Sequence, residues 1–511
     1  MRMCLIVTAA AAILIAACAP LGPDFARPEL PTAGSYEVRP AAMTGAPQGF
    51  VYGADVAGEW YYLFRSDALN GLVREALANS PDLEAARHGL LAAQHELSAV
   101  AGTALPRLDA SGNISRAHVN GSFLYEPISA FSATGNQLNV GLALAYNLDV
   151  FGGVRRSIES QAAAAAYARA QTLNTYVTLV DEVVVTAFDY AASETQIEVT
   201  RSLVEEVRAQ FKLTRHLEAA GKITRSDTLQ VQTQLESTQA TLPALEKQRD
   251  VYANALTQLL GRWPDQSALP YLTLRDFTLP SELPVSLPST LVRQRPDILA
   301  AEDNLHQASA QVGVAEAARY PSLSISAQYA QQATKLDDLF TKAGGIWSFG
   351  LDFAAPLFNG GTLAERADEA AERFRQAQAS YRRTVIAAFV DVANALQAVE
   401  HDADGYAAHL RALDVAGASR DLAIAQLRAG KVTRLQVLIA EQQFQSAALN
   451  QVQADVQRFT DTASLFRALG GGWWNAARDP SSEPAAATDS PYVEAHQSVR
   501  PMGVWPEVRN E

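Results

Sequence analysis

The chain has 511 residues, of which 48% are hydrophobic and 19% are charged, and its formal net charge is −14. This acidic balance argues against a nucleic-acid-binding protein, because phosphate binding needs clustered lysine and arginine. The length would allow three or four ordinary domains, but an internal duplication indicates one architecture built twice.

The N-terminus has the pattern of a lipoprotein signal peptide. The apolar run from Leu5 to Ala17 is too short to span a bilayer, and it ends at Ala17-Cys18, a small-residue site that resembles a bacterial lipobox. We expect residues 1–17 to be removed and Cys18 to be acylated, rather than ordinary cleavage before an incidental cysteine. Ala19 follows Cys18, which by resemblance to bacterial lipoproteins predicts the outer membrane. Cys4 leaves with the signal, so the mature chain has no disulfide.

Composition and repetition divide the rest of the chain. Residues 18–65 are rich in Pro, Gly and Ala and are interpreted as a tether between the lipid and the folded body. Residues 66–262 form a first structural repeat and 295–472 a second one, joined by an irregular, Pro- and Leu-rich equatorial segment at 263–294. The polar, Pro-rich tail at 473–511 is expected to be disordered.

Each repeat begins with a helix that ends at a proline. One helix is expected from Pro81-Asp82 to Pro106 and its counterpart from Pro296-Asp297 to Pro321, and both pairs of landmarks are offset by 215 positions. The two segments, residues 81–106 and 296–321, align without a gap. It indicates that the two repeats share one fold.

After each of these helices the hydrophobic period changes to two. Apolar residues alternate with small or polar ones after Pro106 and Pro321, and again from 138 to 149 and from 347 to 356. Four strands of about 9–11 residues are predicted, each with one apolar face, as expected of a barrel with lipid outside and water inside. A half-buried soluble sheet is the alternative.

Four strands cannot close around water, so several chains must share one barrel. The pattern allows two chains with eight strands or three chains with twelve, and a lumen wide enough for solutes favours three.

Two long amphipathic helices organise the chain. In the first, apolar residues recur every seventh position from Tyr176 to Phe211, and in the second an apolar seam runs from Val385 to Leu427, interrupted at Arg420. This is a coiled-coil register, and the two seams are offset by 209 positions. Each helix ends at a Gly-Lys turn and a helix returns from it, because Gly ends a helix and Thr caps the next one. The fold class is therefore mainly α with a membrane β-barrel, built on duplicated helical hairpins.

These residues together resemble the TolC-like outer-membrane efflux channels, in particular the lipoprotein branch that works with resistance-nodulation-division pumps. The resemblance rests on Cys18, on Gly22-Pro23-Asp24-Phe25 and on the mid-chain run from Leu287 through Arg295-Pro296-Asp297-Ile298 to Glu302, and it extends to about Trp474. It implies a homotrimer with a twelve-stranded barrel in the outer membrane, continuous with a periplasmic helical tunnel. It also implies a periplasmic adaptor protein and an inner-membrane pump as partners.

The resemblance also assigns roles to the helix turns. The residues at the tips match the family's adaptor-contact positions, which here are Gly221, Lys222, Ile223, Thr224, Gly430, Lys431, Val432 and Thr433. Three positions past each tip Thr the family often has an acidic residue at the closed end of the tunnel, and here these positions are Asp227 and Gln436. Three copies of Asp227 would favour cations near this periplasmic gate. Arg225 and Arg434 are candidate latches, or simply part of a solvated face.

The sequence carries no arrangement that predicts an enzyme, a metal site or a cofactor other than the lipid on Cys18. The function expected from the resemblance is the outer-membrane channel of a tripartite pump, which passively conducts small toxic compounds or drugs to the exterior. Two alternatives remain at this point: a type I secretion duct for polypeptides, and a lipid-anchored periplasmic coiled-coil scaffold without transport.

Overall fold

The computed structural model describes residues 20–28, 48–120, 132–266, 268–286 and 288–475. The predicted signal peptide, Cys18 and nearly all of the predicted C-terminal tail lie outside these ranges. Within them the chain forms two compact units. The first contains Gly89–Arg169 and Ala300–Arg382 with the segment up to Pro28, and the second contains Glu29–His88, Ala170–Leu299 and Arg383 onward. Each unit therefore combines corresponding parts of both repeats. The repeat boundaries inferred from the sequence stay a prediction.

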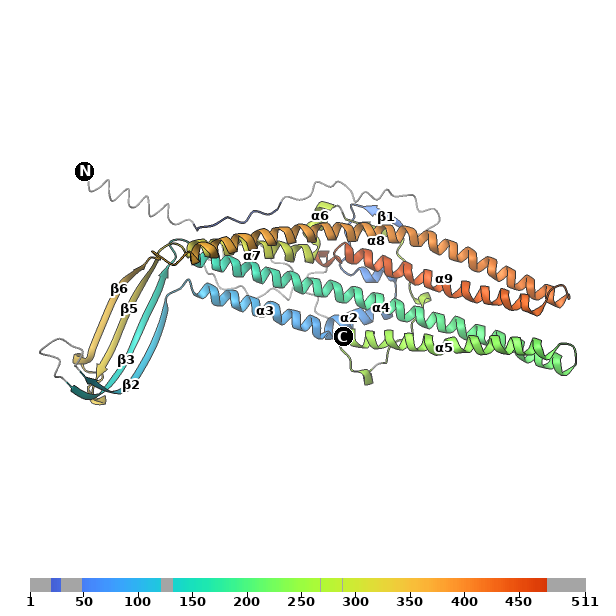
Figure 1. Cartoon of the computed structure of the whole chain (residues 1–511), viewed down its shortest axis with the longest axis horizontal. Coiled ribbons are helices and arrows are strands. Elements are labelled where there is room, and N and C mark those ends of the chain that lie inside the picture. The colour runs from blue at the N-terminus through green and yellow to red at the C-terminus, as the bar shows by residue number, and fades with distance from the viewer. Residues whose placement is uncertain (1–19, 29–47, 121–131, 267, 287, 476–511) are drawn as a thin grey trace. The chain divides into compact units, whose positions relative to one another are not determined.

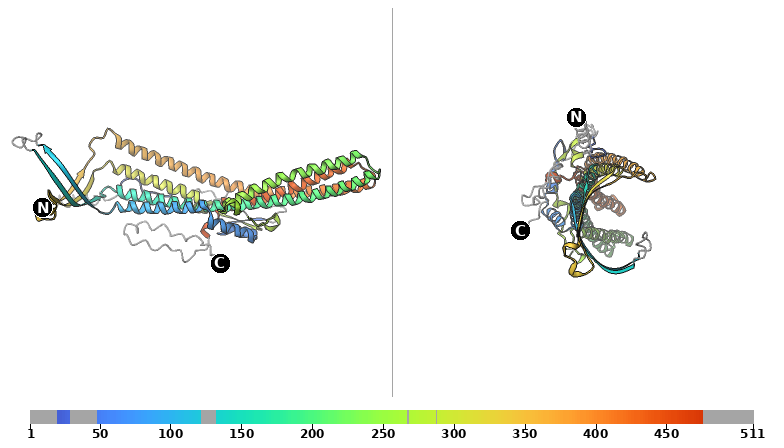
Figure 2. Two further views of the ribbon diagram at one scale, coloured as in Figure 1. Left: turned by 90° about the horizontal axis from the view of Figure 1, so that it is seen from below. Right: turned by 90° about the vertical axis from the view of Figure 1, so that its left-hand side faces the viewer.

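The first unit contains one antiparallel sheet of four strands in the order β2-β3-β5-β6. The strands are β2 (Arg107–Asn120), β3 (Ser132–Leu148), β5 (Ser322–Ala333) and β6 (Gly345–Ala354). Figure 1 shows the four side by side, and the right-hand view of Figure 2 shows the sheet as a curved band. The four predicted strands are confirmed, although three are longer than the 9–11 residues expected. The polar ends of these three strands lack the alternating pattern, so the sequence did not reveal them.

Two hairpins, β2–β3 and β5–β6, have equivalent registers. Arg107 pairs with Ala145 in the first and Ser322 pairs with Ala354 in the second, so the offsets of 215 and 209 seen in the sequence hold in the pairing as well. On β6 the large apolar side chains Trp347, Phe349 and Leu351 are exposed. The sheet thus presents an uncovered apolar face.

The helices also occur in matching pairs. Helices α4 (Gly153–Ala219) and α8 (Thr362–Arg428) both have 67 residues, and α5 (Arg225–Leu259) and α9 (Arg434–Ala468) both have 35. The other helices are α2 (Asp67–Asn79), α3 (Pro81–Gly102), α6 (Pro288–Gln294) and α7 (Pro296–Ala317). In the described part of the chain no helix combines the length and apolarity needed to cross a membrane.

The core of the second unit is built where an aromatic cluster meets the coiled-coil seams. The ring of Trp60 stacks on that of Phe466 with centroids 5.1 Å apart, and Phe188 contacts Phe64 at 4.9 Å and Phe459 at 5.2 Å. Seam residues of α4 from Tyr176 to Val204 are buried. Burying such rings contributes roughly 1.5–3 kcal/mol each.

The seam of α8 behaves differently along its length. Val392, Leu396 and Val399 are buried, whereas Leu410 is 48% exposed. Arg420, which interrupts the seam, stacks its guanidinium 4.0 Å from the ring centroid of Phe444. An apolar row that a single chain leaves uncovered needs a neighbouring surface to bury it.

The segments without a long period contain short elements. Strand β1 (Gly49–Tyr52) pairs in parallel with β4 (Glu282–Val285), and a 3-10 helix, η1, covers Trp60–Phe64. Four-residue strands are too short to produce a period-two signal, so the predicted irregular segment at 263–294 and the predicted tether gave no indication of this pairing.

Candidate functional site: the helix tips

The two turns at the hairpin tips have the same backbone geometry. Gly221 and Gly430 both have φ of +68°, and the amides of Lys222 and Lys431 donate to the carbonyls of Leu217 and Gln426 at 2.9 Å. A left-handed Gly that follows the last helical turn, with this back-reaching hydrogen bond, is the usual way to close a helix. Figure 1 shows both turns at the same end of the hairpins.

Each returning helix is capped by the tip threonine. Thr224 and Asp227 bond reciprocally: the Asp227 amide donates to the Thr224 hydroxyl at 3.3 Å, and the Thr224 amide donates to the Asp227 carboxylate at 3.0 Å. At the second tip the Thr433 amide donates to the Gln436 side-chain oxygen at 2.9 Å. Both tips therefore form a capping box, with a charged partner in one and a neutral partner in the other.

The predicted adaptor-contact residues are accessible in the described chain. Gly221, Lys222, Thr224 and their counterparts Gly430, Lys431 and Thr433 are exposed, and Ile223 and Val432 are half-buried. Exposed lysines beside a half-buried apolar residue give each tip a small mixed surface. Such a surface suits contact with another protein more than binding of a small molecule.

The four predicted gate residues differ in their surroundings. Arg225 and Gln436 are exposed, whereas Arg434 is half-buried. Hydrogen bonds from the hydroxyl and amide of Thr224, with a smaller contribution from Arg434, hold the pKa of Asp227 below its usual range. Asp227 is therefore ionised at neutral pH and carries a negative charge at the first tip.

Arg434 belongs to a polar network that joins the two hairpins. Its guanidinium donates to the Gln210 side-chain oxygen, and the Gln210 amide donates to the Glu441 carboxylate at 2.6 Å. Deeper in, the Gln442 amide donates to the Gln234 side-chain oxygen at 3.0 Å. These bonds connect α4 and α5 of the first hairpin to α9 of the second, so the network couples the two hairpins near their tips.

The network is incompletely satisfied. Glu441 is buried, one of its oxygens has no hydrogen-bond partner among the described residues, and the same holds for Nε of Arg434. Burial raises the pKa of Glu441 despite the Gln210 bond and the nearby Arg434 and Arg420, and burial lowers the pKa of Arg434. Burial removes water from both charged groups at a cost in free energy. The contact between the two hairpins is therefore easier to open than an apolar contact would be.

Gln210 and Glu441 were not among the residues predicted from the sequence. Arg434 and Glu441 recur at a spacing of seven, but Asp455 continues the same row after Ala448, so these charges did not stand out against an apolar seam. A charged residue on a coiled-coil seam commonly specifies register.

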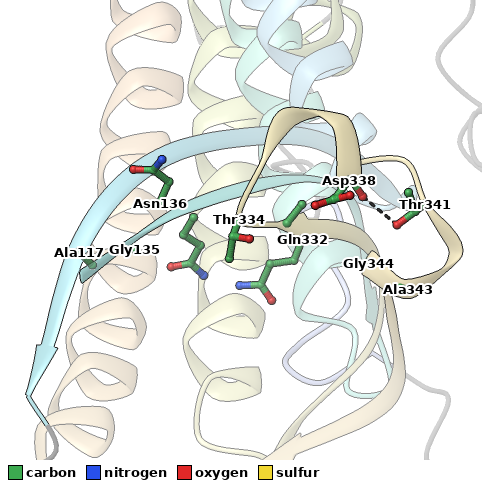
Figure 3. Close-up of a pocket in the computed structure, with 11 residues that line it drawn as sticks. Ala117, Gly135, Asn136, Gln332, Thr334, Asp338, Thr341, Ala343 and Gly344 are labelled. Carbon is green, nitrogen blue, oxygen red and sulfur yellow. Dashed lines mark hydrogen bonds between the residues drawn. The ribbon is translucent and has the colours of Figure 1, made fainter. Parts of the chain in front are cut away.

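In the first unit, the strand ends form an open hollow of about 640 Å³, shown in Figure 3. Its lining is mixed and mostly uncharged: Asn136, Gln137, Gln332, Thr334 and Thr341 lie beside small apolar residues, and Asp338 supplies the single carboxylate. Over the described ranges no group of three or more His, Cys, Asp and Glu side chains is placed to hold a metal ion.

Paired long hairpins with matching tips, joined to a four-stranded sheet with an uncovered apolar face, define a membrane channel subunit. The chain belongs to the outer membrane efflux protein family, whose model matches residues 72–262 and 287–471. This confirms the resemblance, the outer-membrane location and the function as the outer-membrane channel component of an efflux pump. The mainly helical fold with two long hairpins and four strands is confirmed as well.

Particular relatives cover nearly the whole chain. A probable efflux pump outer membrane protein of Pseudomonas putida, SepC, is 29% identical over 90% of this chain and 95% of its own length. A probable outer membrane lipoprotein of Salmonella typhimurium, SilC, is 26% identical over 90% and 97%. The solved structure of the outer-membrane channel OprN is 27% identical and superposes with a TM-score of 0.81, covering 89% of this chain and 99% of that one.

Proposed function

We propose that three copies of this chain form one continuous exit duct, with a twelve-stranded barrel in the outer membrane and a helical tunnel in the periplasm. The observation that carries the proposal is the four-stranded sheet, in which β2 and β6 are edge strands and the apolar face is exposed. An open edge in lipid would leave backbone groups unpaired at a cost of several kcal/mol each. Pairing β6 of one copy with β2 of the next removes every edge.

The internal repeat predicts the register of this pairing. Within the chain β3 pairs with β5, and Ala143 lies opposite Gln328. Adding 209 to a residue number in β3 gives its counterpart in β6, and subtracting 215 from a residue number in β5 gives its counterpart in β2. Applied to the pair Ala143 and Gln328, this places Asp352 opposite Asn113 of the neighbouring copy. The same rule places Phe353 opposite Gly112, so that an aromatic ring covers a glycine, a favourable cross-strand combination.

Cysteine cross-linking tests this register. Asp352→Cys combined with Asn113→Cys is expected to link neighbouring copies into a ladder ending at three chains on a denaturing gel. Asp352→Cys with Asp109→Cys, four positions out of register, is the matched control and is expected not to link. A ladder ending at two chains, or equal linking in both variants, would contradict the shared barrel of three.

The tips are proposed as the contact with a periplasmic adaptor, and the inner-membrane partner as a resistance-nodulation-division pump. Support comes from the exposed Gly-Lys turns and from the relatives, several of which are named as efflux pump components. Relatives named for toluene, antibiotic and cation efflux are similar in sequence to nearly the whole of this chain, so the pump and not the duct is expected to select the cargo. We propose small toxic compounds or drugs as that cargo, and no catalytic step in this chain.

We also propose that Asp227, Gln436, Arg225 and Arg434 surround the periplasmic gate. The ionised Asp227 and the incompletely satisfied Gln210–Arg434–Glu441 network support an arrangement that holds the hairpins together and opens at modest cost. Single-channel recording tests this directly: Gln210→Ala, which removes the bonds to both Arg434 and Glu441, is expected to raise the open fraction, whereas Glu205→Ala on the exposed surface of α4 is not.

Lipid on Cys18 is part of the proposal, supported by the lipobox pattern and by the lipoprotein relative. The intact mass of the mature N-terminal peptide tests it, since three acyl chains add a mass that simple cleavage before Cys18 does not.

A further inference from the structure

The second helical hairpin, formed by α8 and α9, holds two carboxyl groups in contact far from its tip (Figure 1). A hydrogen bond joins the side chains of Asp402 on α8 and Asp461 on α9. Two ionised carboxylates cannot form such a bond, because both only accept hydrogen bonds, so one of the two groups carries a proton. This contact between the helices therefore exists only while the proton is present.

The carboxyl pair lies beside a hollow of about 260 Å³ between the two helices. Asp402, Tyr406, His409 and Gln457 are among the residues that line it, and the Gln457 amide donates to the Asp461 carboxylate at 3.1 Å. The Oδ2 atom of Asp402 is shielded from solvent and has no hydrogen-bond partner among the described residues. A negative charge on Asp402 is therefore poorly solvated.

One buried cation, Arg458 of α9, faces the pair. Its guanidinium lies 4.6 Å from the ring centroid of Tyr406 and donates to the side-chain oxygen of Gln48 at 3.2 Å. The residue is only 6% exposed, and its Nε has no hydrogen-bond partner within the described ranges. Arg458 acts on Asp455 as well as on Asp402. It therefore offsets only part of the negative charge of an ionised pair.

These surroundings favour the protonated pair. Burial raises the pKa of Asp402, Asp461 raises it further, and Arg458 opposes both, so that the pKa is about 7 in place of 3.8. The charged groups that act on Asp402 from α9 are thus Asp461 and Arg458, whereas the segment before β1 contributes the neutral Gln48. Because the folded chain keeps a proton that the unfolded chain releases, the stability from this pair falls as the pH rises from about 4 to 7.

The first hairpin offers an internal comparison at the same level. With the offset of 209 positions, Asp402 and Asp461 correspond to Ser193 and Tyr252, whose side chains are not carboxyl groups. Arg458 corresponds to Arg249, which is more exposed and forms an ion pair with Asp250 at 2.7 Å. The proton-dependent contact therefore belongs to the second hairpin and has no equivalent at these positions of the first.

We propose that Asp402 and Asp461 form a proton-operated clasp, which joins α8 to α9 while the pair is protonated and releases them when the surroundings become alkaline. On release, the O–H bond of the bridging carboxyl breaks, the proton passes to water, and two carboxylates are left that repel each other. The second hairpin then gains freedom of motion near the clasp, whereas the first hairpin does not. This property goes beyond the proposed export duct and does not depend on it.

Amide hydrogen exchange, measured by mass spectrometry on the purified full-length protein in detergent, tests the clasp. Asp402→Asn supplies an amide that donates to Asp461 at any pH, so the variant should stay joined. At about pH 9 we expect peptides covering 395–410 and 454–465 to exchange severalfold faster in the parent protein than in Asp402→Asn. At about pH 5 the two proteins should exchange equally. Comparison at one pH removes the intrinsic pH dependence of exchange.

Asp404→Asn, exposed on the same helix, is the matched control and should exchange like the parent protein at both pH values. Peptides of the first hairpin that contain Ser193 or Tyr252 should not differ among the three proteins. Equal exchange in the parent and Asp402→Asn at alkaline pH, or the same protection in Asp404→Asn, would overturn the clasp.

Infrared absorption tests the shared proton itself, because a protonated carboxyl has a C=O stretching band that a carboxylate lacks. Between about pH 5 and pH 9 the parent protein should lose one more carboxyl band per chain than the double variant Asp402→Asn with Asp461→Asn. An equal loss in both proteins would show that the pair is already ionised at the lower pH and would refute the proposal. Neither measurement requires three copies to share a barrel, so failure of the clasp is separable from failure of the duct.

Discussion

Arg295, at the centre of the mid-chain motif, joins three helices through one buried guanidinium. It bonds the two carboxylate oxygens of Asp297 at 3.0 and 2.7 Å, Asp391 of α8 at 3.1 Å and the Ala468 carbonyl at the end of α9 at 3.0 Å. The carbonyl at the end of a helix carries partial negative charge, so a cation is favoured there. The mid-chain motif that carries the family resemblance therefore also holds three helices together.

Removing this guanidinium is expected to be costly. Arg295→Ala leaves the buried end of α9 and two carboxylates without their partner, and we expect a loss of roughly 3–5 kcal/mol in the free energy of unfolding. Arg293→Ala, two positions away and exposed, is the control and is expected to be nearly neutral. Thermal unfolding of the purified protein in detergent measures both, and equal midpoints for the two variants would contradict the role of Arg295.

The carboxyl group of Asp303 in α7 is expected to make the stability of the fold depend on pH. Burial, reinforced by Glu302, raises its pKa to about 7 from an ordinary value of 3.8. The folded state therefore holds a proton that the unfolded state loses, and stability from this group falls as the pH rises from about 4 to 7.

We expect Asp303→Asn to raise the unfolding midpoint at pH 8 and to flatten its decline over that window, by an amount on the order of 4 kcal/mol at most. Glu96→Gln, exposed on α3, serves as the control. An unchanged pH profile in Asp303→Asn would show that the carboxyl is ionised in the folded protein.

At the scale of elements, the two tips differ in a single capping residue. Gln436 satisfies the amide of Thr433 as Asp227 satisfies that of Thr224, but it adds no charge to the N-terminus of α9. Gln436→Glu is expected to keep the capping box and to stabilise α9 by about 0.3–1 kcal/mol, because a carboxylate complements the helix dipole.

The same change would bring a second carboxylate per copy to the proposed gate. Reversal potentials in planar bilayers are expected to shift toward cations in Gln436→Glu and not in Glu205→Gln, which alters charge on the exposed side of α4. A shift of equal size and opposite sign in the control would place the selectivity elsewhere.

The strands carry a prediction that depends on which face meets lipid. Leu351 lies on the exposed apolar face of β6, and Ser348 lies on the opposite face of the same strand. Leu351→Arg is expected to cost about 2–4 kcal/mol near the bilayer midplane, whereas Ser348→Arg faces the lumen and costs far less. Outer-membrane yield and resistance of the trimer to heat measure the difference, and equal losses would argue for a soluble sheet.

For the whole molecule, the sequence could predict the features that occur in both structural repeats. The offsets of 215 and 209 positions anticipated both helical hairpins and all four strands, because hydrophobic period and residue spacing can be read directly from the sequence. The Gln210–Glu441 contact and the docking of Phe25 on His306 join residues 231 and 281 positions apart. Such contacts form only when complete helices pack against one another, so a local sequence pattern does not predict them.

Assembly with a pump is the last property that belongs to the whole molecule, and the tips offer the test. Lys222 and Lys431 are exposed at equivalent turns, so three copies present six cations on one surface. Changing both to Glu reverses the charge that an adaptor meets, without altering the Gly turns or the Thr caps. We expect drug tolerance of cells carrying this variant to fall to that of a deletion strain, because charge complementarity governs docking.

The trimer and its place in the outer membrane should be unchanged in the double variant, since neither lysine contributes to the sheet or to a buried contact. Lys212→Glu on the exposed side of α4 is the matched control and should keep full tolerance. Restoring tolerance with adaptor variants of opposite charge would locate the contact at the tips. Full tolerance in Lys222→Glu with Lys431→Glu would instead place the adaptor along the sides of the hairpins, where part of the apolar seam of α8 is exposed.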